Sequence, residues 1–544
     1  MRSLSFARAF GLALCGVACR APTAPSPATN TTSPTPTPSN AATVPVRVVL
    51  SPSPDGATAV FELSPSRDAL SFAERGNVRR SAWTTSTTGV TLREEGLTAD
   101  EPWSRAELRL GFDPQEYDRT YPAVTRAGSG AVIYTPALLV EGLDMELAAA
   151  PDTFVWPPLQ APYGYSYLGP RDEIRERGDI RLIGFDGLPA WLAQQIEHAV
   201  DASLPYYASE LGRATSPPTV IASDQSPGPM GFHGDVTENA VIFLRFHGDA
   251  WQTSDPKAAQ EVAKFVRHEA FHLWNRNHAD DAPPWLHEGG AEYAALIAAV
   301  TAGVLTEDEG RQRLSRHVGR CRKHVGEQPM ASVRSGSDVY DCGVVVQWLA
   351  DLEARRPNGE RSVLALWAEV LEGADARDGY SAASFLDRAG PLAQAFVTTT
   401  AGRWTSLEAA LPKYGVGLSS TPTADDHRAA VLQHLMRVAC GPGPIGYWTE
   451  RDHIKLDTGE HCGALAGQPK VTKVGGHSLL ESADRAFAKV EDACAHQRNI
   501  ALTTIDGAKI RLSCPDPITL PSVLTLTRVP KLATGPASAP LSTP

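Results

Sequence analysis

The chain has 544 residues, of which 42% are hydrophobic and 21% charged, so it can form several globular domains with ample core. Its formal net charge of -12 leaves no basic excess for a phosphate backbone, which excludes nucleic acid as a partner. We expect a multidomain protein whose substrate or partner is not a nucleic acid, and the segments described below predict an α+β fold.

Residues 1–19 have the form of an export signal. A basic start and a short apolar run lead to small residues and Cys19, and the stretch GVAC resembles a bacterial lipobox. The run is too short for a mature membrane helix, which needs about 20 residues. Residues 20–45 are dense in Pro, Thr and Ser and predict a disordered tether. We expect an exported protein that meets the membrane only through a lipid on Cys19, with plain secretion as the alternative.

Residues 46–158 are typical of a β domain. Apolar segments such as VRVVL, TAVFEL and AVIYTPALLV are separated by Pro, Gly, Asp and Ser, which predicts an antiparallel, β-sandwich-like arrangement ending in the proline-rich stretch VWPPLQAPYGY. Residues 159–305 then mix strands such as NAVIFLRF with long apolar helices, and residues 306–420 are mainly helical. These two regions predict a catalytic domain followed by a helical subdomain.

The sequence HEAFH carries the clearest chemical signal. Positions i and i+4 of an α-helix share a face, so His268 and His272 can hold one ion between them. Glu269 can take a proton from a water bound to that ion. Apolar neighbours indicate burial, although a surface helix with two hydrogen-bonded histidines is the alternative.

Two residues compete as the third ligand. Glu288 lies on a second helix whose entry is marked by Pro283 and Pro284. His278 has the spacing of the metzincin pattern HExxHxxGxxH, with Asn275 at the glycine position, where asparagine tolerates a left-handed backbone. Glu288 is favoured. Two histidines, one carboxylate and an open fourth position are typical of a catalytic site for one zinc ion.

Glu292 lies one helical turn beyond Glu288 on the same face. It can accept a hydrogen bond from a ligand imidazole and orient the ring, or it can be an ordinary surface acid. His287 projects about 100° away from Glu288 and is expected to be structural.

HEAFHLWN followed by WLHEGGAEYAAL resembles the gluzincin peptidases, in particular the glycyl-aminopeptidase-like family. YDCGVVVQWLADLEARRPNG resembles the Tyr-x-x-Gly helix of that family, and the similarity extends roughly over residues 220–420. It implies a thermolysin-like zincin fold. It also implies roles for five residues, with zinc on His268, His272 and Glu288, the general base at Glu269, and a donor to the developing oxyanion at Tyr340.

Glu238 and Asn239 precede a predicted strand and resemble the Gly-x-Met-Glu-Asn motif of the wider aminopeptidase superfamily, whose glutamate holds the free amine of the substrate. The resemblance implies that Glu238 anchors an amino terminus. A solvated acid at a strand entry is the alternative.

Residues 425–530 form a compact α+β segment that resembles a PDZ domain, with Pro444-Ile445-Gly446-Tyr447 at the expected carboxylate-binding loop for a C-terminal peptide. A disulfide-linked module without a groove is the alternative, and residues 531–544 predict a flexible tail. The cysteines beyond Cys19 are even in number and none forms a CxxC pair, which favours disulfides. They are Cys321, Cys342, Cys440, Cys462, Cys494 and Cys514.

These features predict an exported zinc peptidase, of the aminopeptidase kind, that cuts peptide or protein substrates. One alternative is a catalytically inactive surface protein that holds peptides. The other is a metzincin-like endopeptidase that uses His278.

Overall fold

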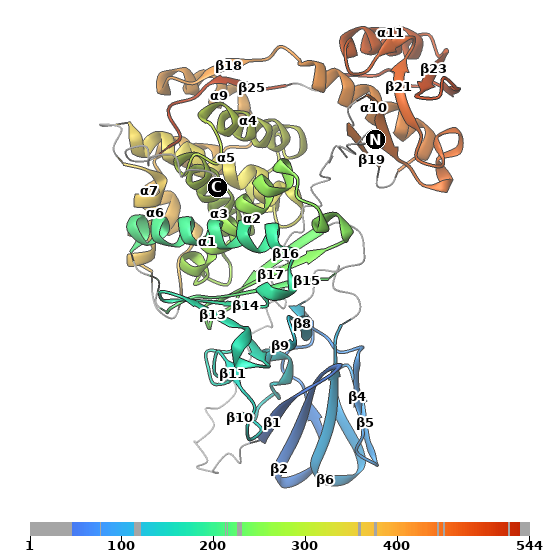
Figure 1. Cartoon of the computed structure of the whole chain (residues 1–544). Helices are drawn as coiled ribbons and strands as arrows, with labels where there is room; N and C mark the ends of the chain where they lie inside the picture. The colour runs from blue at the N-terminus through green and yellow to red at the C-terminus, as the bar shows by residue number, and fades with distance from the viewer. Residues whose placement is uncertain are drawn as a thin grey trace, which may run out of the picture. The chain divides into compact units, whose positions relative to one another are not determined.

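The computed structural model describes residues 46–533, apart from residues 77, 114–120, 213, 215, 226–230, 357–360, 375–377, 443–444, 450–451 and 521–522. The expected export signal with Cys19, the tether and most of the tail lie outside the described residues. The described chain forms two compact units, which Figure 1 shows together and which are treated separately below. One unit holds residues 46–306 and 333–394, and the other holds residues 307–332 and 395–532. Within the described chain, no helix has the length and apolar character to cross a bilayer.

The first unit begins with a β-rich region, as the sequence predicts. Its larger sheet has the strand order β10-β1-β2-β6-β4, with β5 paired to β6. The long strands β2 and β6 pair antiparallel, whereas β1 and β10 run parallel, an exception to the antiparallel expectation. The strands are β1 (Val46–Ser53), β2 (Gly56–Ser71), β4 (Trp83–Thr85), β5 (Val90–Arg93), β6 (Gly96–Gly111) and β10 (Met145–Ala149).

A second, four-stranded sheet shares the core of the first. Its order is β11-β12-β9-β8, and Val124, Ile133 and Leu168 pack in one apolar cluster with residues of the larger sheet. The strands are β8 (Val124–Ala127), β9 (Gly130–Tyr134), β11 (Val155–Trp156) and β12 (Tyr165–Leu168). The β region therefore continues past residue 158, where the sequence placed its end. The proline-rich stretch forms a loop between two paired strands rather than a linker.

The third sheet of this unit is mixed and lies next to the candidate site. Its order is β13-β14-β15-β17-β16, in which β15 and β17 are parallel, almost entirely buried strands and β16 is an antiparallel edge strand. Tyr165 of β12 packs edge-on against Phe243 of β17, with ring centroids 4.8 Å apart, and so joins the second and third sheets. The strands are β13 (Ile174–Arg177), β14 (Ile180–Ile183), β15 (Thr219–Asp224), β16 (Gly231–Val236) and β17 (Val241–His247).

Helices complete the unit. They are α1 (Ala190–Leu211), α2 (Pro256–Asn275), α3 (Pro284–Thr301), α5 (Ser337–Arg355), α6 (Val363–Glu372) and α7 (Ala382–Ala389). Helix α3 packs against both α2 and α5 and is buried along nearly its whole length, because most of its residues are apolar. At its contact with α5, a Cβ on Gly289 would lie 2.3 Å from the Cα of Gly343. The two backbones therefore touch at a pair of glycines.

The second unit contains α4 (Glu307–His324), α9 (Arg403–Ala410), α10 (Ala424–Cys440) and α11 (Ala483–Ala495). The expected helical subdomain at 306–420 is thus divided between the two units. Helix α4 belongs here because it packs on β25 (Thr525–Arg528), where Ser315 Oγ accepts from the backbone N–H of Leu526 at 2.9 Å. Such contacts join segments too far apart in sequence for local patterns to predict.

The C-terminal part of this unit is an α+β module. Its antiparallel sheet has the order β19-β20-β21-β23-β24, and α10 and α11 pack together over a core that both helices share with the strands. The strands are β19 (Gly446–Thr449), β20 (Ile454–Asp457), β21 (Lys470–Val474), β23 (Asn499–Thr504) and β24 (Lys509–Ser513). Pro444 of the expected peptide-binding loop lies outside the described residues, so the PDZ-like groove stays a prediction.

Disulfides occur as the even cysteine number indicates. Cys440 pairs with Cys462 and Cys494 with Cys514, and Cys321 and Cys342 are disulfide-bonded as well.

Candidate metal centre

Helices α2 and α3 bring three ligand atoms together. His268 Nε2 lies 3.2 Å from His272 Nε2 and 3.2 Å from Glu288 Oε2, and His272 Nε2 lies 3.7 Å from the same oxygen. The histidines come from successive turns of α2, and Glu288 comes from the first turns of α3, as their spacing predicts. His268 and Glu288 are buried, and His272 is half-buried.

These separations fit a tetrahedral zinc ion. Bonds of about 2.0–2.1 Å from zinc to nitrogen and oxygen place neighbouring ligand atoms about 3.3 Å apart. The three distances of 3.2, 3.2 and 3.7 Å bracket that value, so small side-chain movements suffice to hold an ion. The donor set, two imidazoles and one carboxylate, is one of those found in catalytic zinc sites.

The outer nitrogen of His272 is fixed as a donor. Asn275 Nδ2 donates to the backbone carbonyl of His287 at 2.9 Å, which leaves Asn275 Oδ1 as an acceptor. His272 Nδ1 lies 2.8 Å from that oxygen and must donate to it. In the neutral ring, Nε2 then carries a lone pair directed at the other ligand atoms, which is the tautomer that binds a metal.

The outer nitrogen of His268 is held in a similar way. Its Nδ1 lies 3.2 Å from Glu292 Oε2, and the other oxygen of Glu292 is ion-paired with Lys264. The Lys264 ammonium favours the ionised carboxylate, which can only accept, so His268 Nδ1 donates. Glu292 therefore lies where its role in orienting a ligand was expected, and it is buried rather than on the helix surface.

The centre favours one positive charge. Burial alone lowers the pKa of His268, but its hydrogen bonds with Glu288 and Glu292 outweigh burial and raise this pKa to about 10. Burial likewise opposes ionisation of Glu288, yet its contacts with the imidazoles of His268, His272 and His287 hold its pKa well below its usual range. A divalent cation bound by the same residues would supply this positive charge in place of the proton on His268.

Glu269 points its carboxyl group toward the edge strand β16. A Cβ on Gly234 would lie 2.2 Å from Glu269 Cδ, so the strand passes the carboxyl group only because residue 234 has no side chain. Burial raises the pKa of Glu269 to about 7, although the neighbouring histidines oppose the shift. A carboxyl group that titrates near neutrality is suited to general-base catalysis.

Tyr340 lies beside this centre. It is half-buried on α5, and its ring centroid is 5.8 Å from that of His268. The structure therefore brings it to the side of the metal ligands.

Glu238 is exposed in the turn between β16 and β17. The turn is anchored by Asn239, whose Nδ2 donates to the carbonyl of Tyr165 at 2.9 Å. Burial lowers the pKa of Arg276 and the negative charge of Glu238 opposes this shift, so the two side chains interact electrostatically. A substrate amine bound by Glu238 would therefore lie near the Arg276 guanidinium, which already interacts with this carboxylate.

His278, the alternative third ligand, is not in the cluster, and His287 lies differently from the expectation. His278 is outside the three-atom cluster; its ring stacks on that of His287, with centroids 4.5 Å apart and planes 5° apart. His287 does not point away from the site, because its Nε2 lies 3.5 Å from Glu288 Oε1. A long imidazole side chain can reach back to the carboxylate although the two Cβ atoms diverge on the helix.

Sequence reasoning missed Lys264 and the orienting role of Asn275. Lys264 lies one helical turn before His268, and Asn275 lies in the turn after His272. Both therefore occupy the helix face that carries the ligands, and a search of that face for polar partners of each imidazole could have found them.

No protein-family model matches this sequence, and no curated protein matches it significantly. Among solved structures, the fold is similar to yeast LTA4 hydrolase in complex with bestatin, at 11% identity and a TM-score of 0.37 over 72% of each chain. Native leukotriene A4 hydrolase from Saccharomyces cerevisiae gives 10% identity and a TM-score of 0.37, again over 72% of each chain. Likenesses this distant assign neither a family nor an activity to the chain.

Proposed function

We propose that this chain is a zinc-dependent peptidase. The observation that carries the proposal is the cluster of His268 Nε2, His272 Nε2 and Glu288 Oε2, with both outer imidazole nitrogens engaged by acceptors and Glu269 next to the first ligand. A purely structural zinc site closes its fourth position with protein. A buried acid of raised pKa beside a three-ligand set instead favours hydrolysis.

The residues divide the chemistry among them. Zinc, when bound, supplies Lewis-acid activation of water and of the scissile carbonyl. Glu269 takes the proton of the attacking water and passes it to the leaving amine. Tyr340 donates to the oxygen on which negative charge develops, an interaction worth several kcal/mol in related chemistry.

The edge strand β16 gives a peptide substrate a place to bind. Among the described residues it pairs only with β17, on one side. An extended peptide that pairs with its other side would bring main-chain groups past Gly234 and thus to the Glu269 carboxyl group. Glu238, in the turn that follows the same strand, is our candidate for binding the substrate amine, which would make the enzyme an aminopeptidase.

The test is Glu269→Gln, which removes the base while leaving the three ligands in place. We expect the variant to retain zinc and to lose peptide turnover by roughly 10²–10⁴-fold. Glu372→Gln, an exposed change on α6, is the matched control and should act like wild type. A wild-type protein that holds zinc but cleaves no peptide would instead support the inactive peptide-binding alternative.

Amino-blocked and free peptides then separate the two modes of cleavage. If Glu238 holds the amine, free peptides are cut faster, and Glu238→Gln removes most of that preference. Equal rates of cleavage of amino-blocked and free peptides would indicate an endopeptidase and would exclude the proposed role of Glu238. Export with lipidation of Cys19 stays a separate proposal, tested by whether Cys19→Ser releases the protein from membranes.

A further inference from the structure

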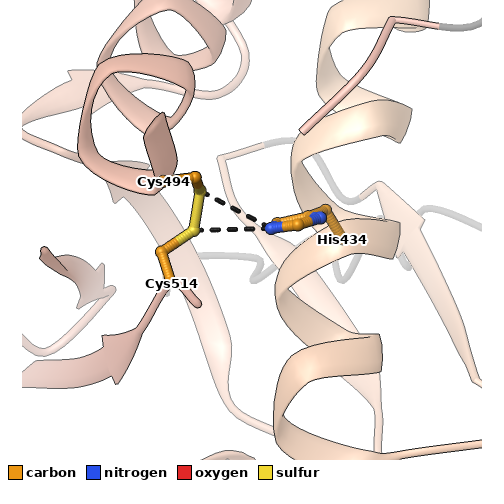
Figure 2. A group of neighbouring side chains, drawn as sticks. All are labelled: His434, Cys494 and Cys514. Carbon is orange, nitrogen blue, oxygen red and sulfur yellow. Dashed lines mark hydrogen bonds between the residues drawn. A yellow bond between two sulfur atoms is a disulfide. The ribbon is translucent and has the colours of Figure 1, made fainter. Parts of the chain in front are cut away.

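The C-terminal module holds a second cluster of metal-binding atoms. His434 on α10 points its Nε2 at both sulfurs of the Cys494–Cys514 disulfide, at 3.5 Å from Cys494 Sγ and 3.4 Å from Cys514 Sγ (Figure 2). Cys494 lies in the last turn of α11 and Cys514 directly follows β24. Both cysteines are buried and His434 is half-buried.

The fold brings these residues together from distant parts of the module. Helices α10 and α11 pack against each other, and Cys494 and Cys514 both belong to the apolar core that the helices share with the sheet. His434 thus places its imidazole against a disulfide whose two cysteines belong to this apolar core. Burial lowers its pKa, so the ring is neutral at neutral pH and can act as a ligand through a nitrogen lone pair.

The distances from nitrogen to sulfur fit a tetrahedral ion. Bonds of about 2.3 Å to sulfur and about 2.0–2.1 Å to nitrogen separate these atoms by about 3.5 Å, and they separate two sulfurs by about 3.8 Å. The observed 3.4 and 3.5 Å already meet the first requirement. Only the sulfur atoms must move apart, which requires that the disulfide is reduced.

We propose that Cys494, Cys514 and His434 form a redox-dependent metal site, a disulfide when oxidised and a ligand set for zinc or another soft divalent ion when reduced. An external dithiol reductant donates two electrons and two protons to the Cys494–Cys514 disulfide. The reductant becomes a disulfide, and both cysteines of the protein become thiols. Metal binding then releases both thiol protons and forms two metal–sulfur bonds and one metal–nitrogen bond.

This site gives the module two alternative cross-links. In the oxidised protein, the disulfide joins the end of α11 to the end of β24. In the reduced protein, the metal ion joins the same two points and adds α10 through His434. The reduced module thus keeps a cross-link in a compartment that opens disulfides. The proposal does not depend on peptidase activity, because the catalytic ligands belong to the other compact unit.

Cobalt binding to the full-length protein tests the site. The protein is reduced under anaerobic conditions with a phosphine, and Co²⁺ is then added. In the reduction, the phosphine becomes a phosphine oxide with the oxygen atom of a water molecule, and the two protons of that water go to the two cysteine sulfurs. We expect a thiolate-to-cobalt charge-transfer band at one ion per chain, present only after reduction. The catalytic centre offers nitrogen and oxygen ligands only, so cobalt bound there gives no such band.

Matched variants identify the ligands. Cys494→Ser should abolish the band, and His434→Ala should weaken cobalt binding at least tenfold, since second-shell losses alone cost about that much. The Cys440–Cys462 disulfide gives the controls, because it also has a histidine nearby: His461 is exposed, and its Nε2 lies 3.8 Å from Cys462 Sγ. His461→Ala and Cys462→Ser should keep the band.

Three results would overturn the proposal. The first is a folded, reduced protein with both thiols free and no charge-transfer band. The second is unchanged cobalt affinity in His434→Ala, which would exclude the imidazole. The third is a module that unfolds on reduction and does not refold when metal is added. In that case the three ligands are held together only by the closed disulfide, which cannot bind a metal ion.

Discussion

Gly234 lies where β16 passes the Glu269 carboxyl group, and replacing it by alanine perturbs the proposed base without touching a ligand. The added Cβ would lie 2.2 Å from Glu269 Cδ and 2.4 Å from its Oε1. Ordinary contacts of this kind are about 3.5–4.0 Å, so the carboxyl group must move by more than about 1 Å. The strand itself can stay, because the obstructing atoms are the end of a flexible side chain.

A shift of this size should reduce catalysis much more than folding. Misplacement of a catalytic group by about 1 Å can cost 10²-fold, so we expect kcat/KM to fall roughly 100-fold, which is about 2.7 kcal/mol of transition-state stabilisation. Zinc content and melting temperature should stay close to wild type. The assay combines peptide turnover, bound zinc and thermal unfolding on the same preparations.

Gly231→Ala is the control on the same strand. A Cβ there has no atom within 4 Å, so this variant should keep full activity. Our reasoning is refuted if Gly234→Ala turns over peptides like wild type. It is refuted equally if Gly231→Ala loses as much activity, since the cause would then be a general response of β16 to alanine.

Two further predictions concern the ligands, and one concerns Tyr340. Asn275→Ala removes the acceptor of His272 Nδ1 and should weaken zinc binding about 10–100-fold by competition with a chelator, whereas Asn275→Asp keeps an acceptor and should recover part of the loss. Burial lowers the metal-free pKa of His268, but the neighbouring carboxylates outweigh burial and raise it to about 10, so zinc must displace a proton and its affinity should rise about tenfold per pH unit below pH 10. Calorimetry in buffers of different ionisation enthalpy would detect this proton, and a pH-independent affinity would contradict it. Tyr340→Phe should lower kcat about 10²–10³-fold with bound zinc unchanged, and equal turnover would show that the hydroxyl makes no transition-state contact.

The part of the site that could be predicted from the sequence is the part that depends on helical spacing. HEAFH places two imidazoles on one face of α2, and Pro283 and Pro284 mark the start of the helix that returns Glu288 to them. The mixed α/β composition and the β-rich start of the chain follow from equally local patterns. These inferences need only the period of each element and its end signals.

The edge strand β16 shows what local patterns miss. Its sequence, GFHGDV, contains two glycines, a histidine and an aspartate, and lacks the β-branched and aromatic pattern that predicts a strand. It is extended because β17 supplies a complete antiparallel partner, from Gly231 opposite His247 to Val236 opposite Ile242. Pairing of this kind is a tertiary effect, and so is the reach of His287 to Glu288.

The contact between α3 and α5 connects the two sides of the proposed active site. A Cβ on Gly343 would lie 2.4 Å from the carbonyl oxygen of Trp285 and 2.6 Å from the Cα of Gly289, so both positions need glycine for the helices to approach this closely. Glu288 precedes Gly289 on α3, and Tyr340 lies one helical turn before Gly343 on α5. The Tyr-x-x-Gly spacing therefore has a physical reason. The glycine brings α5 against α3, and the same approach brings the tyrosine ring beside a metal ligand.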